Sequence, residues 1–106
     1  GRNNITIATT EIILISAAND YIAIQTASKK YLHTETLKSI QAKLDSHRFL
    51  RIHKSSIINL DKVVSYRSRL NGDYDILLSN QQETRLSRNF APTFKAMMEK
   101  QTQLSR

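Results

Sequence analysis

The side chains best suited to bind a charged partner are concentrated in residues 48–60, which read RFLRIHKSSIINL. Apolar residues suited to a core are interleaved there with groups that can donate to phosphates and bases. These groups belong to Arg48, Arg51, His53, Lys54, Ser55 and Asn59. From Arg48 to Arg69 the chain holds six Lys or Arg residues and one acid, Asp61. Such a surface attracts a polyanion, although basic amphipathic segments are also typical of ordinary solvated faces.

The net charge of +7 is unevenly distributed along the chain. Residues 1–47 hold five basic and four acidic side chains, whereas residues 48–106 hold eleven basic and five acidic ones. The second half therefore carries most of the excess positive charge. No segment joins these cations to the Trp- or Leu-rich face of a membrane-surface helix, so the asymmetry favours a nucleic-acid partner. Composition does not choose between DNA and RNA.

Other kinds of chemistry find little support in the residue types. The chain has no Cys, and His33, His47 and His53 show neither i,i+4 spacing nor an HExxH context, so we expect no metal site. The adjacent His53, Lys54 and Ser55 are poorly placed for base and nucleophile roles, and no GxSxG elbow is present. With Gly1 and Gly72 as the only glycines, there is no phosphate-binding glycine loop. We expect no enzyme activity and no cofactor.

The chain has the size and composition of one domain, residues 1–106, with a core at about 5–100 and a frayed tail at 101–106. No apolar run approaches the ~20 residues that cross a bilayer, and the start lacks the apolar region of a signal peptide. We therefore expect a cytoplasmic protein. The absence of an initiator Met suggests a domain cut from a longer protein, although a processed amino terminus would look the same.

The first half predicts short strands followed by one helix. Clusters of apolar and β-branched residues predict strands at 5–7, 11–15, 21–26 and 31–33. Leu37, Ile40 and Leu44 recur at helical spacing, and Thr34 or Thr36 is suited to cap the start of that helix.

The second half predicts further strands and a closing helix. Strands are expected at 49–52, 63–66 and 84–86, with a tight or single-turn element at 54–58 and a polar turn at 79–82. Asn71-Gly72, followed by alternating Tyr74, Ile76 and Leu78, predicts a tight hairpin. Phe90, Phe94 and Met97 or Met98 mark the last helix, with Pro92 in its first turn. The fold class is thus mainly β with short helices and is not a helix-turn-helix, so loops would have to read bases.

The order FLRIHKSSIINLDKVVSY, then a hairpin, then TRLSRNF resembles the LytTR (LytR/AlgR-type) DNA-binding domain of bacterial response regulators. The resemblance extends over nearly the whole chain. The matching positions, in order, are Phe49, Arg51, His53, Ser55, Ile58, Asn59, Ser87 and Arg88. It implies an elongated arrangement of small, mainly antiparallel sheets that inserts loops into successive major grooves and bends the duplex.

Three loops would carry the contacts: the turn at 19–21, the corner at 53–55 and the junction at 87–89. The candidates for base contacts are Arg88, Lys54 and Asn19, with Arg88 suited to pair bidentately with guanine. The candidates for phosphate contacts or for positioning the loops are His53, Ser55, Asn89, Ser87, Tyr21, Arg51 and Arg85. For Lys54 a phosphate contact is the safer alternative, and Asn59 is expected to fix the turn before Val63.

The expected partner is double-stranded promoter DNA, bound by two copies on imperfect direct repeats, with a receiver domain preceding residue 1 in the full-length protein. Two alternatives from other classes remain open. An RNA-binding module is one, although the chain lacks the aromatic platform of RNA-recognition sheets and the GxxG of KH domains. A protein-interaction domain with a basic face is the other.

Overall fold

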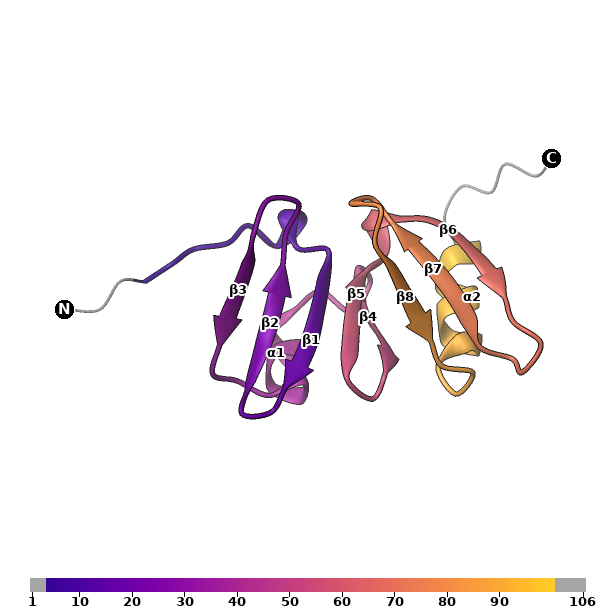
Figure 1. The fold of residues 1–106 in the computed structure, drawn as a ribbon, viewed down its shortest axis with the longest axis horizontal. Helices are drawn as coiled ribbons and strands as arrows, with labels where there is room; N and C mark the ends of the chain where they lie inside the picture. Colours follow the sequence, from indigo (N-terminus) through magenta and orange to yellow (C-terminus); the bar gives the residue numbers. More distant parts are fainter. Residues whose placement is uncertain (1–3, 101–106) are drawn as a thin grey trace.

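The computed structural model describes residues 4–100, which form two antiparallel sheets side by side and two short helices (Figure 1). The molecule is elongated, with dimensions of 54 × 25 × 24 Å. The first sheet has the strand order β3-β2-β1-β5-β4 and the second has the order β6-β7-β8. The predicted class, mainly β with small antiparallel sheets, is confirmed. The two helices pack in different regions and form no helix-turn-helix within residues 4–100.

The elements of the first sheet run from a short 3-10 helix to a pair of strands in the middle of the chain. In order they are η1 (Thr9–Glu11), β1 (Leu14–Ala18), β2 (Tyr21–Gln25), β3 (Lys30–His33), α1 (Leu37–Lys43), β4 (Phe49–His53) and β5 (Ser56–Asn59). The second sheet is built from η2 (Leu60–Lys62), β6 (Val63–Ser68), β7 (Tyr74–Leu78), β8 (Glu83–Leu86) and α2 (Ala91–Glu99).

The helix α1 forms as its spacing predicts. Thr36, and not Thr34, is the N-cap, and its hydroxyl accepts from the Ser39 backbone N–H at 3.0 Å. Leu37 is buried, and Ile40 and Leu44 pack against the same apolar cluster. Its apolar stripe therefore faces the first sheet, as expected of a packing helix.

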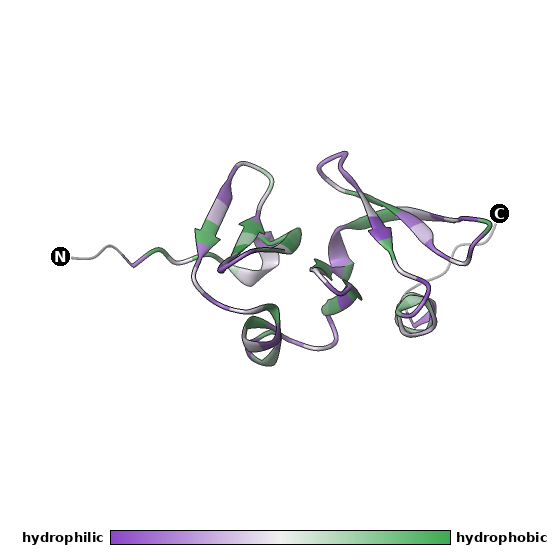
Figure 2. Cartoon of the chain, turned by 60° about the horizontal axis from the view of Figure 1, so that its bottom comes forward, coloured by the Kyte–Doolittle hydropathy of each residue, from purple (hydrophilic) through white to green (hydrophobic). Residues whose placement is uncertain are grey.

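The strand β5 joins the two halves of the core. Ile57 packs with the cluster that includes Ile15, Ile22 and Leu37, whereas Ile58 packs with the cluster that includes Phe94. Because successive side chains of a strand point to opposite faces, a strand with both faces buried carries a continuous apolar run. In Figure 2, apolar residues (green) lie mainly on the strands and helices, and hydrophilic residues (purple) occupy most turns.

Three predicted elements need correction. Residues 5–7 form no strand, because alternation without a partner strand makes no ladder; Ile5 is exposed while Ile7 packs against the core. The strand expected at 11–15 starts only at Leu14, since Glu11 ends a 3-10 helix. The turn expected at 54–58 is confined to Lys54 and Ser55, and the rest is the central strand β5.

The predicted hairpin is confirmed as β6 and β7, but its loop is wider than a two-residue turn. Ser68 pairs with Tyr74, so residues 69–73 form the connection. Gly72 alone in this loop has positive φ, at +94°, while the Asn71 side chain accepts from the Asp73 N–H at 3.0 Å. The turn at 79–82 and the helix with Pro92 in its first turn are also confirmed. The tail predicted at 101–106 lies outside the described residues.

Asn59 has the structural role expected of it. Its side chain is buried, donates to the Ile12 carbonyl at 2.9 Å and accepts from the Asp61 N–H at 3.0 Å. These bonds tie the start of η2 to the segment that precedes β1. An amide with both ends satisfied is what a buried polar side chain requires.

Candidate nucleic-acid interface

The three loops singled out in the sequence leave the fold at one edge. The β1–β2 turn, the β4–β5 turn and the β8–α2 junction all lie along the lower edge in Figure 1. The β6–β7 loop lies at the same edge. Antiparallel neighbours alternate their turns between the two ends of a sheet, so every second connection shares an edge. The fold therefore gathers segments that are far apart in the sequence.

The β1–β2 turn is tight because Asn19 adopts a left-handed backbone, with φ of 58°. Ala18 pairs directly with Tyr21, which leaves Asn19 and Asp20 as the two turn residues. Asn is among the few non-glycine residues that tolerate this conformation. The side chains of Asn19, Asp20 and Tyr21 are exposed to solvent.

The β4–β5 corner is braced by its own side chains. The imidazole Nδ1 of His53 accepts from the Ser55 N–H at 3.2 Å and lies 2.8 Å from the Ser55 hydroxyl. Because Nδ1 is an acceptor in these bonds, we assign the ring proton of the neutral form to Nε2, where it can donate outward. The side chain of Lys54, at the tip of the corner, is exposed.

Arg51 also stabilises this corner, by hydrogen bonds to its backbone carbonyls. Its Nε donates to the His53 carbonyl at 3.0 Å and one Nη donates to the Lys54 carbonyl at 2.7 Å. The other Nη donates to Gln41 Oε1 on α1 at 3.3 Å. The planar fork of a guanidinium reaches all three acceptors at once, which an ammonium cannot do. The corner is thereby connected to α1.

The β8–α2 junction is attached to the rest of the fold by backbone bonds. The Ser87 N–H donates to the Ile52 carbonyl at 2.9 Å, which places the junction beside β4 and the corner. The Phe90 N–H donates to the Ser87 carbonyl at 2.8 Å and closes the turn before α2. Arg88 and Asn89 expose their side chains at this turn, whereas Ser87 is half-buried.

A cluster of ion pairs lies on the second sheet, next to the junction. Asp75 faces Arg69 at 3.0 Å, Arg85 at 3.5 Å and Arg67 at 3.6 Å. The hydrogen bond from Arg69 is the main reason that the pKa of Asp75 lies below its usual value, and the charges of the other two guanidinium groups add to the shift. Arg85 also contacts Asp73 at 3.2 Å. The charge of Arg85 is thus partly neutralised within the protein.

The sequence reasoning missed two contributors near Arg88. Asp73 accepts from the Arg88 backbone N–H at 2.9 Å, and this bond is the main cause of the lowered pKa of its carboxyl group. Lys95 on α2 lines the same shallow hollow as Arg88 and lies over the Tyr74 ring at 5.9 Å from its centre. Arg88 lies in the turn before α2 (Ala91–Glu99), so no helical spacing in the sequence indicates that Lys95 lies near it.

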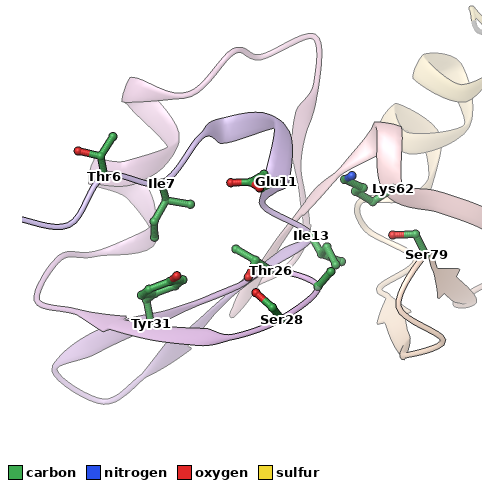
Figure 3. A pocket seen from close by; sticks show the side chains of 10 residues that line it. Thr6, Ile7, Glu11, Ile13, Thr26, Ser28, Tyr31, Lys62 and Ser79 are labelled. Atoms are coloured by element: carbon green, nitrogen blue, oxygen red, sulfur yellow. The ribbon is translucent and has the colours of Figure 1, made fainter.

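A separate cleft of about 370 Å³ opens between the two sheets on the opposite edge (Figure 3). It is lined by the segment before η1, the β2–β3 turn, η2 and the β7–β8 turn, with Glu11, Tyr31 and Lys62 among its side chains. Thr26 is satisfied inside its own turn by bonds to the Lys29 backbone. The cleft is remote from the three loops and contributes nothing to their edge.

Comparison with known families identifies the class of protein. Residues 2–99 match the family described as the LytTr DNA-binding domain, and the chain belongs to that family. A solved structure described as the LytTr DNA-binding domain of a putative methyl-accepting/DNA response regulator from Bacillus cereus has the same fold. It superposes with a TM-score of 0.82, covers 89% of this chain and 86% of its own, and is 16% identical. The family is one of DNA-binding domains and not a class of enzymes.

Similar curated proteins are known from staphylococci. The chain is 32% identical over 89 residues to the sensory transduction protein LytR of Staphylococcus epidermidis, which is 84% of this chain and 35% of that protein. It is 34% identical over 85 residues to the transcriptional regulatory protein LytR of Staphylococcus aureus, which is 80% of this chain and again 35% of the relative. The chain thus spans about a third of the length of these relatives.

Two further observations concern residues 4–100. No helix among them is long and apolar enough to cross a membrane. Their His, Asp and Glu side chains form no group of three or more that could hold a metal ion.

Proposed function

We propose that this chain is the DNA-reading output domain of a cytoplasmic bacterial two-component transcription regulator, joined in the full-length protein to an upstream receiver domain. It recognises duplex promoter DNA in a sequence-specific manner and acts as two copies on imperfect direct repeats. The names of the staphylococcal relatives support the regulatory role. The main structural support is the common edge of the three loops that carry Asn19, Lys54 and Arg88.

The shape of the molecule is suited to successive major grooves. Its long dimension of 54 Å exceeds one turn of duplex DNA, which is about 34 Å. Loops spaced along such a body reach more than one groove on the same side of the duplex, and bending the DNA toward the body improves their fit. The energy of that bend depends on the sequence being bent, so part of the specificity comes from base pairs that no side chain touches.

The roles of the loops follow from the donors they expose. Arg88 pairs with a guanine through O6 and N7, and Asn19 supplies a second, weaker base contact. Lys54 contacts a base or the adjacent phosphate, while His53 Nε2, Tyr21, Ser87 and Asn89 contact phosphates. Arg51 and Ser55 act by positioning the corner, because their polar groups already bond within it. Arg85 acts mainly within its ion-pair cluster.

The proposal is tested by fluorescence anisotropy on a randomised duplex pool at several salt concentrations, with sequencing of the bound fraction. We expect enrichment of a spaced direct repeat whose affinity falls steeply with salt. Fluorescence energy transfer between labelled ends of the selected duplex then measures the bend. Matched duplex RNA and single strands are the controls. Binding that enriches no motif contradicts a sequence-specific regulator and favours the protein-interaction alternative, while preference for RNA favours the RNA-binding one.

A further inference from the structure

Asp73 is an acid at an edge where the protein meets a polyanion. Its side chain is only 18% exposed and belongs to the β6–β7 loop, which lies at the same edge as the β8–α2 junction. A carboxylate in this position weakens the attraction to phosphates. It is well accommodated nonetheless, because Arg85 and Asn71 bond to its Oδ2 at 3.2 and 3.3 Å.

The other carboxylate oxygen reaches across to the junction. Oδ1 of Asp73 accepts from the backbone N–H of Arg88 at 2.9 Å, although the two residues are fifteen positions apart. This is a charge-assisted bond, which is shorter and stronger than one between neutral groups. Gly72, the neighbour of Asp73, lies beneath the Arg88 side chain, since a Cβ on Gly72 would come within 3.4 Å of the Arg88 Cβ. The β6–β7 loop therefore contacts both the backbone and the side-chain stem of Arg88.

We propose that Asp73 is a positioning residue that sets the direction of Arg88 and thereby determines how strictly one base pair is read. The inference rests on the proposed base contact of Arg88. A bidentate contact with guanine needs the guanidinium in the plane of the base, so a small rotation of the backbone at Arg88 weakens the pairing. Asp73 touches no DNA in this role; it fixes the peptide from which Arg88 projects.

Asp75 provides the matched control. It lies two residues further on, is similarly covered with 15% exposure, and also pairs with Arg85. The described contacts of Asp75 are with Arg67, Arg69 and Arg85, and none of them involves the Arg88 backbone. Asp73→Ala and Asp75→Ala therefore remove the same charge from the same cluster, and they strengthen attraction to phosphates alike. Only Asp73→Ala removes the bond to Arg88.

The experiment measures the dissociation constant for the selected duplex and for its single-base variants, with each protein below its melting temperature. We expect Asp73→Ala to reduce discrimination at the base pair read by Arg88 by about threefold to tenfold. Asp75→Ala leaves that ratio unchanged, and Asp73→Asn, which keeps an acceptor oxygen, retains most of it. In an Arg88→Ala background, Asp73→Ala has little further effect on that base pair. Uniform changes across all base pairs in Asp73→Ala would overturn the proposal.

A second readout needs no DNA. Hydrogen exchange of the Arg88 amide, followed by NMR, is expected to accelerate in Asp73→Ala and to stay unchanged in Asp75→Ala. An Arg88 amide that exchanges equally fast in both variants contradicts the positioning role. If the amide is released only in Asp73→Ala but Arg88→Ala relaxes no base pair, then the proposed function of Arg88 is wrong while the bond from Asp73 stands.

Discussion

The β4–β5 corner and the β8–α2 junction share an edge but are stabilised in different ways. The corner is held largely by its own hairpin, through the bonds between His53 and Ser55 and the Arg51 fork. The junction is held from outside, by the Ile52 carbonyl and by Asp73. A locally braced loop keeps its shape wherever the hairpin folds, whereas the junction depends on both sheets, because Ile52 belongs to β4 and Asp73 to the β6–β7 loop. The comparison predicts that substitutions behind the corner change stability, and that those around the junction change selectivity.

The largest effect is expected for Asn59→Ala, at the end of the corner hairpin. Loss of its amide leaves the buried Ile12 carbonyl and the Asp61 N–H without their partner, which costs about 2 to 4 kcal/mol of unfolding free energy. Urea denaturation measures the change. Asn80→Ala is the control. The Asn80 side chain also accepts from the backbone N–H two residues later, that of Gln82, but the β7–β8 turn in which it lies is less buried. Equal losses in the two variants would show that burial is not the cause.

Arg88→Ala tests the junction directly. We expect a loss of about 1 to 3 kcal/mol in binding free energy and relaxed discrimination at one base pair, with unchanged unfolding by urea. Competition binding with single-base variants of the selected duplex measures both quantities. A loss that is uniform over all sequences would reassign Arg88 to a phosphate.

Arg51→Lys probes the brace of the corner. Lys keeps the charge but cannot reach both the His53 and Lys54 carbonyls, so we expect a loss of about 1 to 2 kcal/mol in stability. The salt dependence of DNA binding should stay as in the parent protein, because a positioning residue releases no counterion. If instead the slope of log affinity against log salt falls by roughly one unit, Arg51 contacts a phosphate of the DNA directly. Arg48→Lys, at an exposed pair with Asp61, is the matched control and should change stability little.

Lys54→Ala should have a smaller effect, confined to affinity. Loss of one phosphate contact lowers the slope of log affinity against log salt by roughly one unit, with little change in sequence preference. Anisotropy titrations at several salt concentrations measure it. Relaxed discrimination at one base pair would make Lys54 a base-reading residue and would bring the corner closer in role to the junction.

The smallest effect is expected when the pH is lowered, because protonation of Asp73 weakens its bond to the Arg88 N–H at the junction. The pKa of Asp73 is lowered in the folded state, first by the Arg88 N–H and then by Arg85 and Asn71. Its stabilising contribution is therefore fully present above the unfolded value near 3.8 and is lost as pH falls through the lower folded value. Carboxyl carbon shifts should report a midpoint below 3.8, and the Arg88 amide should exchange faster below it, after correction for intrinsic rates. A midpoint at or above 3.8 would contradict the bond.

Much of the positioning of the site was predictable from local patterns. The helical spacing of Leu37, Ile40 and Leu44 gives α1, and the hairpin around Gly72 has the expected strands on either side. The bend at Asn19 lies where the turn residues Asn19 and Asp20 follow one another, and the bend at Lys54 lies in the basic segment singled out in the sequence. These features depend on interactions between residues close in sequence, for which periodicity and turn chemistry are sufficient guides.

The elements that sequence reasoning misplaced depend on distant partners. Ile57 and Ile58 form a strand because β1 and β4 flank them and because each of their two faces meets a separate core. A short apolar run of this kind does not distinguish a strand from other buried structure. Conversely, apolar and polar residues do alternate at 5–7, but this segment pairs with no other strand in the part of the chain that the structure describes.

The sequence by itself determined the class of the fold, the excess of positive charge in its second half and the motif that marks a LytTR domain. Those properties follow from residue type and local spacing. Only the tertiary structure decided that the three loops share an edge and that Asp73 holds Arg88 from fifteen residues away. The physical reason is that such a bond depends on the pairing of β6, β7 and β8, which brings two loops together at one end of a sheet.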